Sequence, residues 1–184
     1  MKKILFLLVC TMGCLSALAQ DYLAKGYRGF GEIGGRGVVL FGDNFVISED
    51  DLSSFSINTI HGYQINKYVF AGGGLSIQPF MYSYDSEDYS FTEVACFLDL
   101  NVDLGRKISP FAETRLGFVG GDFSGPYSAA AIGIRIYRVS ISLGLETEKY
   151  TSFSIGDTEY KLDKKINVNS VLFNVAVDWG KRNN

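Results

Sequence analysis

The chain has 184 residues, of which 47% are hydrophobic, and a formal net charge of −3. This length suits one domain, and the hydrophobic content excludes an intrinsically disordered chain. Gly (21), Phe (14) and Tyr (11) are abundant, whereas Pro occurs only 3 times. Such a composition favours many strands joined by tight turns over helices.

The N-terminal residues predict a signal peptide. Lys2 and Lys3 precede a short apolar core, and the Ala-Leu-Ala of residues 17–19 forms a small-residue cleavage site. We therefore expect residues 1–19 to be removed after export and residues 20–184 to form the mature domain.

Cleavage at this site also determines which cysteines remain in the mature chain and what net charge it carries. Cys10 and Cys14 leave with the signal peptide, so Cys96 remains alone and no internal disulfide can form. The mature chain keeps 15 basic and 20 acidic residues, a net charge of −5, which argues against nucleic acid as a partner. A lipoprotein attached through Cys14 is the alternative, although residues 17–19 fit a cleavage site better.

Alternation of polar and apolar residues with a period of two predicts eight strands in the mature domain. In chain order they cover residues 27–40, 54–65, 69–82, 91–104, 109–120, 127–136, 139–149 and 167–179.

The first two strands show the pattern less cleanly than the later ones. In the first, Arg28, Glu32 and Arg36 share one face, and the other face is rich in glycine. The second strand alternates least clearly. Its parity places His61, the single histidine, on the apolar face, which suggests a β-bulge or a misplaced strand.

The later strands separate their two faces well. In the fourth strand, residues 94 to 104 are apolar at every even position, and the odd positions from 93 to 103 include three carboxylates. The sixth, seventh and eighth strands repeat the pattern with isoleucine, leucine and valine on one face. The charged residues on the polar faces are candidates for ion pairs inside a barrel: Arg28, Glu32, Arg36, Glu93, Asp99, Asp103, Glu113, Arg115, Arg135, Glu146 and Asp178.

The connections alternate between short and long. Short turns are expected near residues 66–67, 105–107 and 137–138, and longer loops at residues 42–53, 83–90, 120–126 and 150–166. Short turns at one end and longer loops at the other are typical of outer-membrane barrels, with both termini at the periplasmic, short-turn end.

Alternation alone also fits a soluble barrel whose apolar face points inward. Here the polar faces mix charges with Gly, Ala, Ser and Tyr, as a narrow filled interior requires. A mid-strand cation such as Arg135 would cost about 2–4 kcal/mol if it faced lipid at the midplane. We therefore expect the apolar faces to meet lipid and the charged faces to form a plug of ion pairs with little or no open channel.

Aromatic residues gather near both predicted ends of the strands, where two girdles at the membrane interfaces are expected. The predicted periplasmic girdle contains Tyr22, Tyr27, Tyr63, Tyr68 and Trp179, and the opposite girdle contains Tyr82, Tyr84, Tyr89, Phe91, Tyr127 and Tyr150.

Several short phrases resemble those of small eight-stranded outer-membrane β-barrels, the OmpA/OmpX-like family of the porin superfamily. They lie at residues 26–30, 60–66, 70–74 and 108–111. The resemblance implies an all-β, eight-stranded antiparallel up-and-down transmembrane β-barrel. It also implies a monomer in contact with outer-membrane lipid and lipopolysaccharide, inserted by the barrel-assembly machinery. Barrels of this family often end on an aromatic residue. Here five residues follow Trp179, and the resemblance therefore implies less certain recognition of the last strand by that machinery.

These patterns predict a non-enzymatic integral outer-membrane protein of Gram-negative bacteria, without cofactor or metal, whose extracellular loops contact a surface or a partner that the sequence does not identify. A narrow porin-like channel and a soluble exported lipocalin-like barrel that binds an apolar ligand are the alternatives. A lipid-modifying enzyme has the least support, because no serine or carboxylate lies near His61 in a catalytic arrangement.

Overall fold

The computed structural model describes residues 23–39, 53–84, 87–104, 106–121, 123–155 and 158–182. The predicted signal peptide lies outside these ranges. The strands are β1 (Leu23–Val39), β2 (Ser53–Gln64), β3 (Val69–Tyr84), β4 (Glu87–Asp103), β5 (Ile108–Gly121), β6 (Phe123–Ile136), β7 (Val139–Ile155) and β8 (Thr158–Arg182). Within the described residues, no helix is long and apolar enough to cross a membrane.

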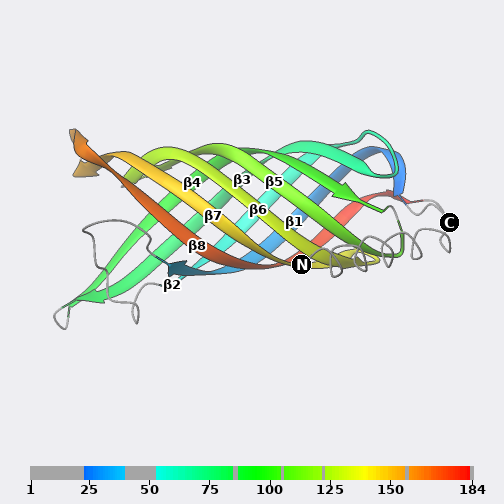
Figure 1. Ribbon diagram of the computed structural model, residues 1–184, viewed down its shortest axis with the longest axis horizontal. Coiled ribbons are helices and arrows are strands. Elements are labelled where there is room, and N and C mark those ends of the chain that lie inside the picture. Colours follow the sequence, from blue (N-terminus) through cyan, green and yellow to red (C-terminus); the bar gives the residue numbers. More distant parts are fainter. Residues whose placement is uncertain are drawn as a thin grey trace, which may run out of the picture.

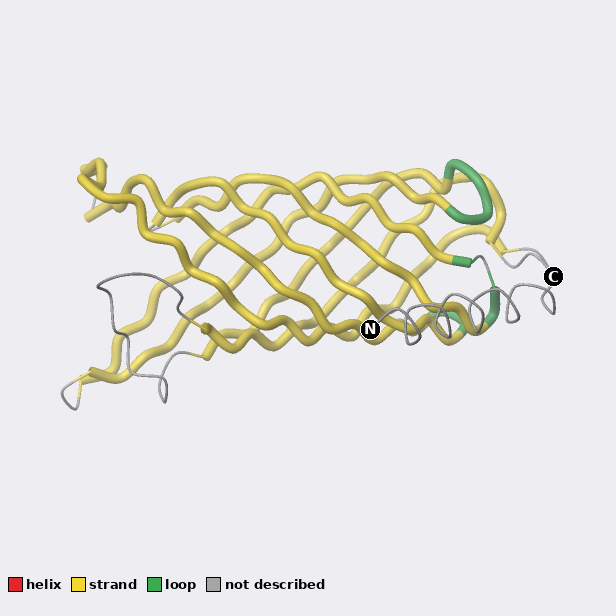
Figure 2. The backbone as a smooth tube through the Cα atoms, viewed as in Figure 1, coloured by secondary structure: helices red, strands yellow, loops and turns green. Residues whose placement is uncertain are grey.

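Each strand pairs antiparallel with the next one in sequence, and β1 pairs with β8 to close the barrel. Figure 1 shows the strands as a tilted, up-and-down cylinder, and Figure 2 shows the short turns gathered at one end. The prediction of an all-β barrel of eight antiparallel strands is confirmed. Leu23 pairs with Arg182, so the barrel begins and ends at the short-turn end.

The alternation of the sequence becomes an alternation between interior and exterior. On β4, Glu93, Phe97 and Asp99 point inward and are buried, whereas Val94 and Leu98 point outward, with Leu98 73% exposed. Because the exposed side chains are apolar and the buried ones include charges, the arrangement is inverted relative to a water-soluble barrel. It is the arrangement of a transmembrane β-barrel.

At the end opposite the short turns, the strands extend further than expected. The β3–β4 pairing continues to Tyr84 and Glu87, and the β7–β8 pairing continues to Ile155 and Thr158. The expected long loops at 83–90, 120–126 and 150–166 are therefore mostly strand, and the expectation was wrong there. These segments are rich in Tyr, Phe, Ser and Thr, of which the aromatic residues and threonine favour paired strands. Most of the fourth expected loop, residues 42–53, lies outside the described ranges.

The tightest turn joins β6 to β7 through Tyr137 and Arg138. Ile136 pairs with Val139 across it, as expected. Tyr137 has a φ of 56°, which is rare for a bulky residue. Its N–H donates a 2.6 Å hydrogen bond to the carbonyl of Lys107 in the β4–β5 turn. This bond between two turns offsets part of the cost of the unusual backbone conformation.

Phenylalanine rings fill the interior where neighbouring strands carry glycine. The Phe70 ring lies 2.7 Å from the positions that a Cβ would take at Gly62 and at Gly72. Phe97 covers Gly74 in the same way. A Cβ at these glycines would overlap both an aromatic ring and a backbone carbonyl oxygen of the neighbouring strand, so glycine is required for the strands and rings to pack this closely.

Candidate functional site

Charged side chains from every strand except β2 and β3 form three clusters along the interior. We call them the turn-end cluster (Arg28, Asp103, Arg135, Asp178), the central cluster (Glu32, Asp99, Glu113, Arg115) and the hairpin-end cluster (Arg36, Glu93, Glu146, Glu148). All of these side chains are at most 8% exposed.

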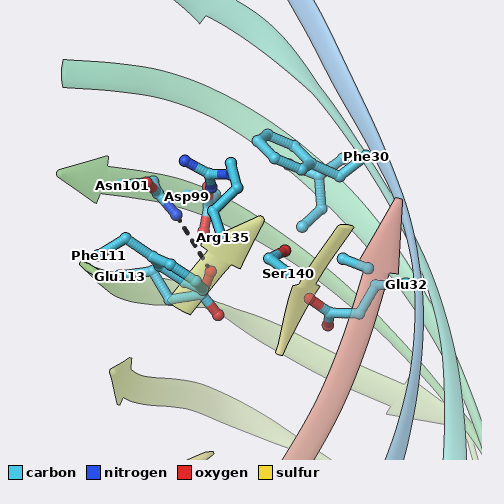
Figure 3. A pocket seen from close by; sticks show the side chains of 10 residues that line it. Phe30, Glu32, Asp99, Asn101, Phe111, Glu113, Arg135 and Ser140 are labelled. Atoms are coloured by element: carbon cyan, nitrogen blue, oxygen red, sulfur yellow. Dashed lines mark hydrogen bonds between the residues drawn. The ribbon is translucent and has the colours of Figure 1, made fainter. Parts of the chain in front are cut away.

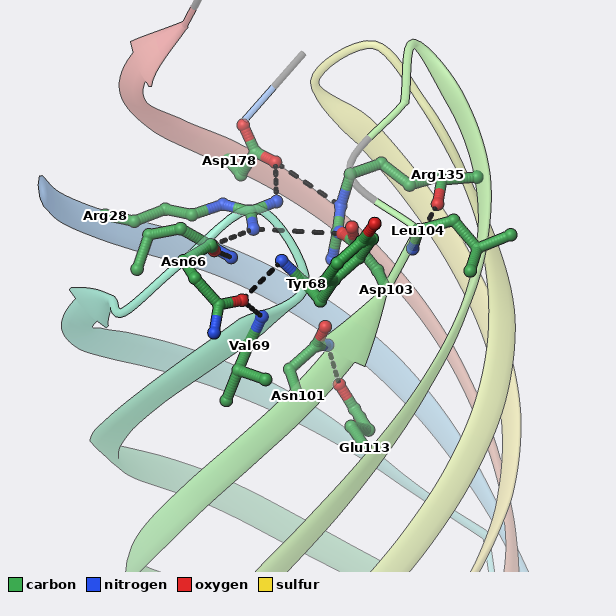
Figure 4. A network of polar contacts seen from close by, with 12 residues as sticks. Arg28, Asn66, Tyr68, Val69, Asn101, Asp103, Leu104, Glu113, Arg135 and Asp178 are labelled. Atoms are coloured by element: carbon green, nitrogen blue, oxygen red, sulfur yellow. Dashed lines mark hydrogen bonds and ion pairs between the residues drawn. The ribbon is translucent and has the colours of Figure 1, made fainter. Parts of the chain in front are cut away.

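The turn-end cluster joins two arginines to two aspartates (Figure 4). Arg28 Nη2 lies 2.7 Å from Asp178 Oδ2, and Arg28 Nη1 donates to Gln64 Oε1 at 2.7 Å. Arg135 forms ion pairs with Asp103 and, through Nε at 3.5 Å, with Asp178. Each carboxylate therefore meets both cations, since Arg28 Nη1 also lies 3.9 Å from Asp103.

The central cluster places three carboxylates around one arginine. Arg115 donates to both oxygens of Glu32 at 2.8 Å, the bidentate geometry that suits guanidinium and carboxylate groups. Arg115 Nη2 also lies 2.9 Å from Glu113, and Arg115 Nε lies 3.5 Å from Asp99. Asn58 of β2 donates a further hydrogen bond of 2.5 Å to Glu32.

The hairpin-end cluster also surrounds one arginine. Arg36 Nη2 lies 2.5 Å from Glu148 Oε2, and Arg36 Nη1 lies 2.8 Å from Glu146 Oε1. Gln78 accepts a hydrogen bond from Arg36, and the Tyr150 hydroxyl donates to Glu148 at 2.6 Å.

Glu93 differs from the other carboxylates of the interior. It is fully buried, with 0% of its surface exposed, and it lies in register between Gln78 of β3 and Gly121 of β5. Neither of its carboxylate oxygens meets hydrogen-bond geometry with the described residues. Arg36 attracts Glu93 without forming an ion pair with it. Burial of a carboxylate without a cation in contact is costly, so Glu93 is less well compensated than the paired carboxylates of its cluster.

The clusters differ in charge balance. Among the described residues, the turn-end cluster pairs two guanidinium groups with two carboxylates, and each of the other clusters has one guanidinium group for three carboxylates. The named cluster near the short turns is therefore balanced in charge, and the two other named clusters are acidic.

A cavity of about 10 Å³ lies among Phe30, Glu32, Asp99, Glu113 and Arg135 (Figure 3). This volume holds roughly one water molecule. Arg135 and Phe111 stack here, with the guanidinium carbon 4.9 Å from the ring centroid.

The structure places all the predicted ion-pair candidates on the inner face of the barrel. It brings them together in groups that parity alone does not reveal, and Glu93 makes no ion pair within the described ranges. Glu148 is absent from the predicted candidates, although it shares the parity of Glu146 on the same strand. The predicted candidates also lack the neutral partners Asn58, Gln64 and Gln78, which lie at inward positions of β2 and β3.

His61 lies on the outer surface, as its parity indicates. The Tyr27 hydroxyl lies 2.5 Å from His61 Nδ1, and Thr59 Oγ1 lies 2.8 Å from His61 Nε2. The suggestion of a β-bulge or misplaced strand was wrong, because His61 pairs in unbroken local register with Gly29 and Gly73. Tyr27 and Thr59 satisfy both ring nitrogens at this exposed position, so a regular strand tolerates the histidine.

Two residues of the expected aromatic girdle at the hairpin end lie inside the barrel instead. Tyr127 is 4% exposed and Tyr150 is 6% exposed. Each occupies an inward position next to the hairpin-end cluster, so their assignment to the girdle was wrong. At the turn end, Tyr27, Tyr63 and Trp179 do point outward and are between 38% and 54% exposed.

Metal binding has no geometric support in the described part of the chain. No group of three or more His, Cys, Asp or Glu side chains there has an arrangement that could hold a metal ion.

No known protein family and no curated protein matches the sequence. Among solved structures, the chain is similar to Ail, the attachment invasion locus protein of Yersinia pestis, with a TM-score of 0.49 and 11% identity over 85% of this chain and 100% of that chain. A second structure of Ail, in complex with the heparin analogue sucrose octasulfate, gives a TM-score of 0.47 and 11% identity over 87% and 100%. The N-terminal β-barrel domain of Pseudomonas aeruginosa OprF gives 0.40 and 14% over 85% and 100%. These likenesses concern overall shape, and the closed register of eight strands establishes the fold of this chain independently.

Proposed function

We propose that this chain is a non-enzymatic integral outer-membrane protein with a plugged polar interior, and that its extracellular hairpins contact the cell surroundings or a partner. The observation that carries the proposal is the inverted distribution of side chains. Leu98, Ile132 and Leu145 are between 67% and 73% exposed on the outer wall, whereas Arg28, Arg115 and Arg135 are at most 2% exposed inside. Only a lipid exterior makes this distribution favourable.

The proposal includes export and orientation. A signal peptide at residues 1–19 directs the chain out of the cytoplasm, and the barrel-assembly machinery inserts the mature domain as a monomer. The short turns and both chain ends then lie in the periplasm, as in bacterial barrels of this size. The long β3–β4 and β7–β8 hairpins lie on the outside of the cell, next to lipopolysaccharide.

The plugged interior is supported by the ion pairs that cross it. Arg115 of β5 binds Glu32 of β1, and Arg36 of β1 binds Glu148 of β7, so side chains bridge the barrel between non-adjacent strands. An interior of eight strands is just wide enough for such side chains. The lipocalin-like alternative requires an apolar interior, which these charges oppose.

Planar-bilayer recording tests the plug. The folded wild-type barrel should give no stable conductance step. A variant that removes the central bridge, Arg115→Ala combined with Glu32→Ala, should conduct because water replaces two long side chains. Phe55→Ala, on the outer wall, is the control and should remain silent. Stable conductance from the wild-type barrel would favour the narrow-channel alternative.

Location is tested separately. The mature protein should fractionate with the outer membrane and should migrate faster in an unheated detergent gel than after boiling. A folded protein that stays in solution without detergent would overturn the membrane assignment.

A further inference from the structure

The outer wall of the barrel is hollowed near the short turns. An apolar hollow of about 910 Å³ lies against β4 to β8, and its lining includes Leu104, Pro110, Ala112, Ile134 and Ile136. These side chains lie on the face that the proposed function gives to lipid.

Small side chains on β5 create the hollow. Ala112 is exposed on the outer face of β5 and pairs with Val102 on β4 and Ile132 on β6. Val102 is 47% exposed and Ile132 is 70% exposed, so both project past the short alanine. Pro110, the next outward residue toward the turn, is also small. The floor on β5 therefore lies between two raised apolar walls.

Cationic residues lie where the hollow reaches the turns. Leu104 and Ile136 of the lining directly precede the β4–β5 and β6–β7 turns, which carry Lys107 and Arg138. Both cationic residues are exposed. The bond from the Tyr137 N–H to the Lys107 carbonyl holds the two turns side by side. Neither cation lines the hollow itself, and Arg138 Nη1 donates to the Asp178 carbonyl at 3.4 Å. The two positive charges therefore lie at the turns next to an acyl-sized hollow, and we call them its rim.

The remaining short turn lacks this combination. In the β2–β3 turn, Lys67 Nζ lies 4.9 Å from the ring centroid of Tyr68, its own neighbour. Asn66 closes the turn by accepting hydrogen bonds from the N–H groups of Tyr68 and Val69. Lys67 is therefore a matched cation at the same end of the barrel but away from the hollow.

We propose that the hollow binds one phospholipid of the periplasmic leaflet, with an acyl chain on the Ala112 floor and the phosphate between Lys107 and Arg138. The inference rests on the proposed function for its membrane and its orientation. Apolar contact alone does not select a bound lipid from bulk lipid, because acyl chains are as apolar as the wall. The hollow over Ala112 and the attraction between the lipid phosphate and the two cationic side chains would distinguish the bound phospholipid from bulk lipid. Lipopolysaccharide also carries phosphates and acyl chains, but it occupies the opposite leaflet.

A larger side chain at Ala112 tests whether the shape of the hollow is needed for lipid binding. Barrels reconstituted in nanodiscs of phosphatidylglycerol are released into the gas phase, and retained lipid is counted by native mass spectrometry. Wild type should retain one lipid, and Ala112→Leu should weaken retention roughly tenfold, equivalent to 1.4 kcal/mol. Ala71→Leu makes the same change on the outer face of β3 and should leave retention unchanged. Equal retention by wild type and Ala112→Leu would overturn the proposal.

The charge is tested at the rim. Lys107→Ala combined with Arg138→Ala should reduce phosphatidylglycerol retention, whereas Lys67→Ala should not. Diacylglycerol, which has the acyl chains without phosphate, should be retained poorly by wild type. Retention of diacylglycerol equal to that of phosphatidylglycerol would contradict the phosphate site.

These outcomes separate the two proposals. A protein that fails to insert into nanodiscs and to shift in the unheated gel would overturn the proposed function itself. A barrel that inserts and shifts but retains lipid independently of Ala112 and the rim would overturn the phospholipid site alone.

Discussion

Buried charges are compensated differently at the two ends of the barrel interior. At the turn end, Arg28 and Arg135 face Asp103 and Asp178, so each charge has a counter-charge in contact. At the hairpin end, a single arginine is shared by Glu146 and Glu148 while Glu93 lies buried beside them. The difference indicates that each carboxylate of the turn-end cluster can lose one cation and keep another, whereas each of the two acidic clusters depends on one arginine.

The largest effect is expected where one arginine serves three carboxylates. Arg115→Met should lower the free energy of unfolding by about 5 kcal/mol, because removal of one partner leaves uncompensated buried charge. Urea titration in lipid vesicles, followed by tryptophan fluorescence of Trp179, measures the change. If Arg115→Met lowers the free energy of unfolding less than an arginine variant at the turn end does, the proposed difference between the clusters is contradicted.

A smaller loss is expected in the balanced cluster. Arg135→Met should cost about 3 kcal/mol, because Arg28 still contacts Asp178 at 2.7 Å and lies 3.9 Å from Asp103. The same titration applies, with outward Ile134→Met as a control for the change in side-chain shape. If Arg135→Met and Arg115→Met lower the free energy of unfolding equally, the second arginine of the turn-end cluster does not compensate for the loss of the first.

The smallest effect, and one of opposite sign, is expected at Glu93. Glu93→Gln should raise the free energy of unfolding by about 1 kcal/mol, since it removes a buried charge that has no cation of its own. Glu148→Gln is the matched comparison on the same cluster and should cost about 2 kcal/mol, because it weakens charged hydrogen bonds to Arg36. A loss at Glu93 as large as that at Glu148 would show that Glu93 is paired in the folded protein.

Much of the fold is predictable because the strand period is two, so each residue's parity assigns it to one wall of the barrel. Parity placed Arg28, Glu93 and Arg135 on the inner wall and His61 on the outer wall. It says nothing about height along the barrel axis, which depends on the tilt and stagger of the closed sheet. The contact between Arg36 and Glu148, 112 residues apart in the chain, therefore needed the structure.

The ends of the strands were less predictable for a related reason. Tyr, Phe and Thr suit both an exposed loop and a paired strand, and only the neighbouring strand decides between them. Tyr127 and Tyr150 were misassigned because a girdle was inferred from residue type near a strand end. Their inward parity was the better signal, since Tyr127 shares it with Ala129 and Ala131.

The closure of β1 on β8 has a consequence for biogenesis. The ion pair between Arg28 and Asp178 joins residues 150 positions apart, so it can form only when the first and last strands have come together. A barrel in which β8 has not yet paired with β1 would expose an open hydrogen-bonding edge to the bilayer. Pairing of the C-terminal strand β8 with β1 is therefore the step that closes the barrel.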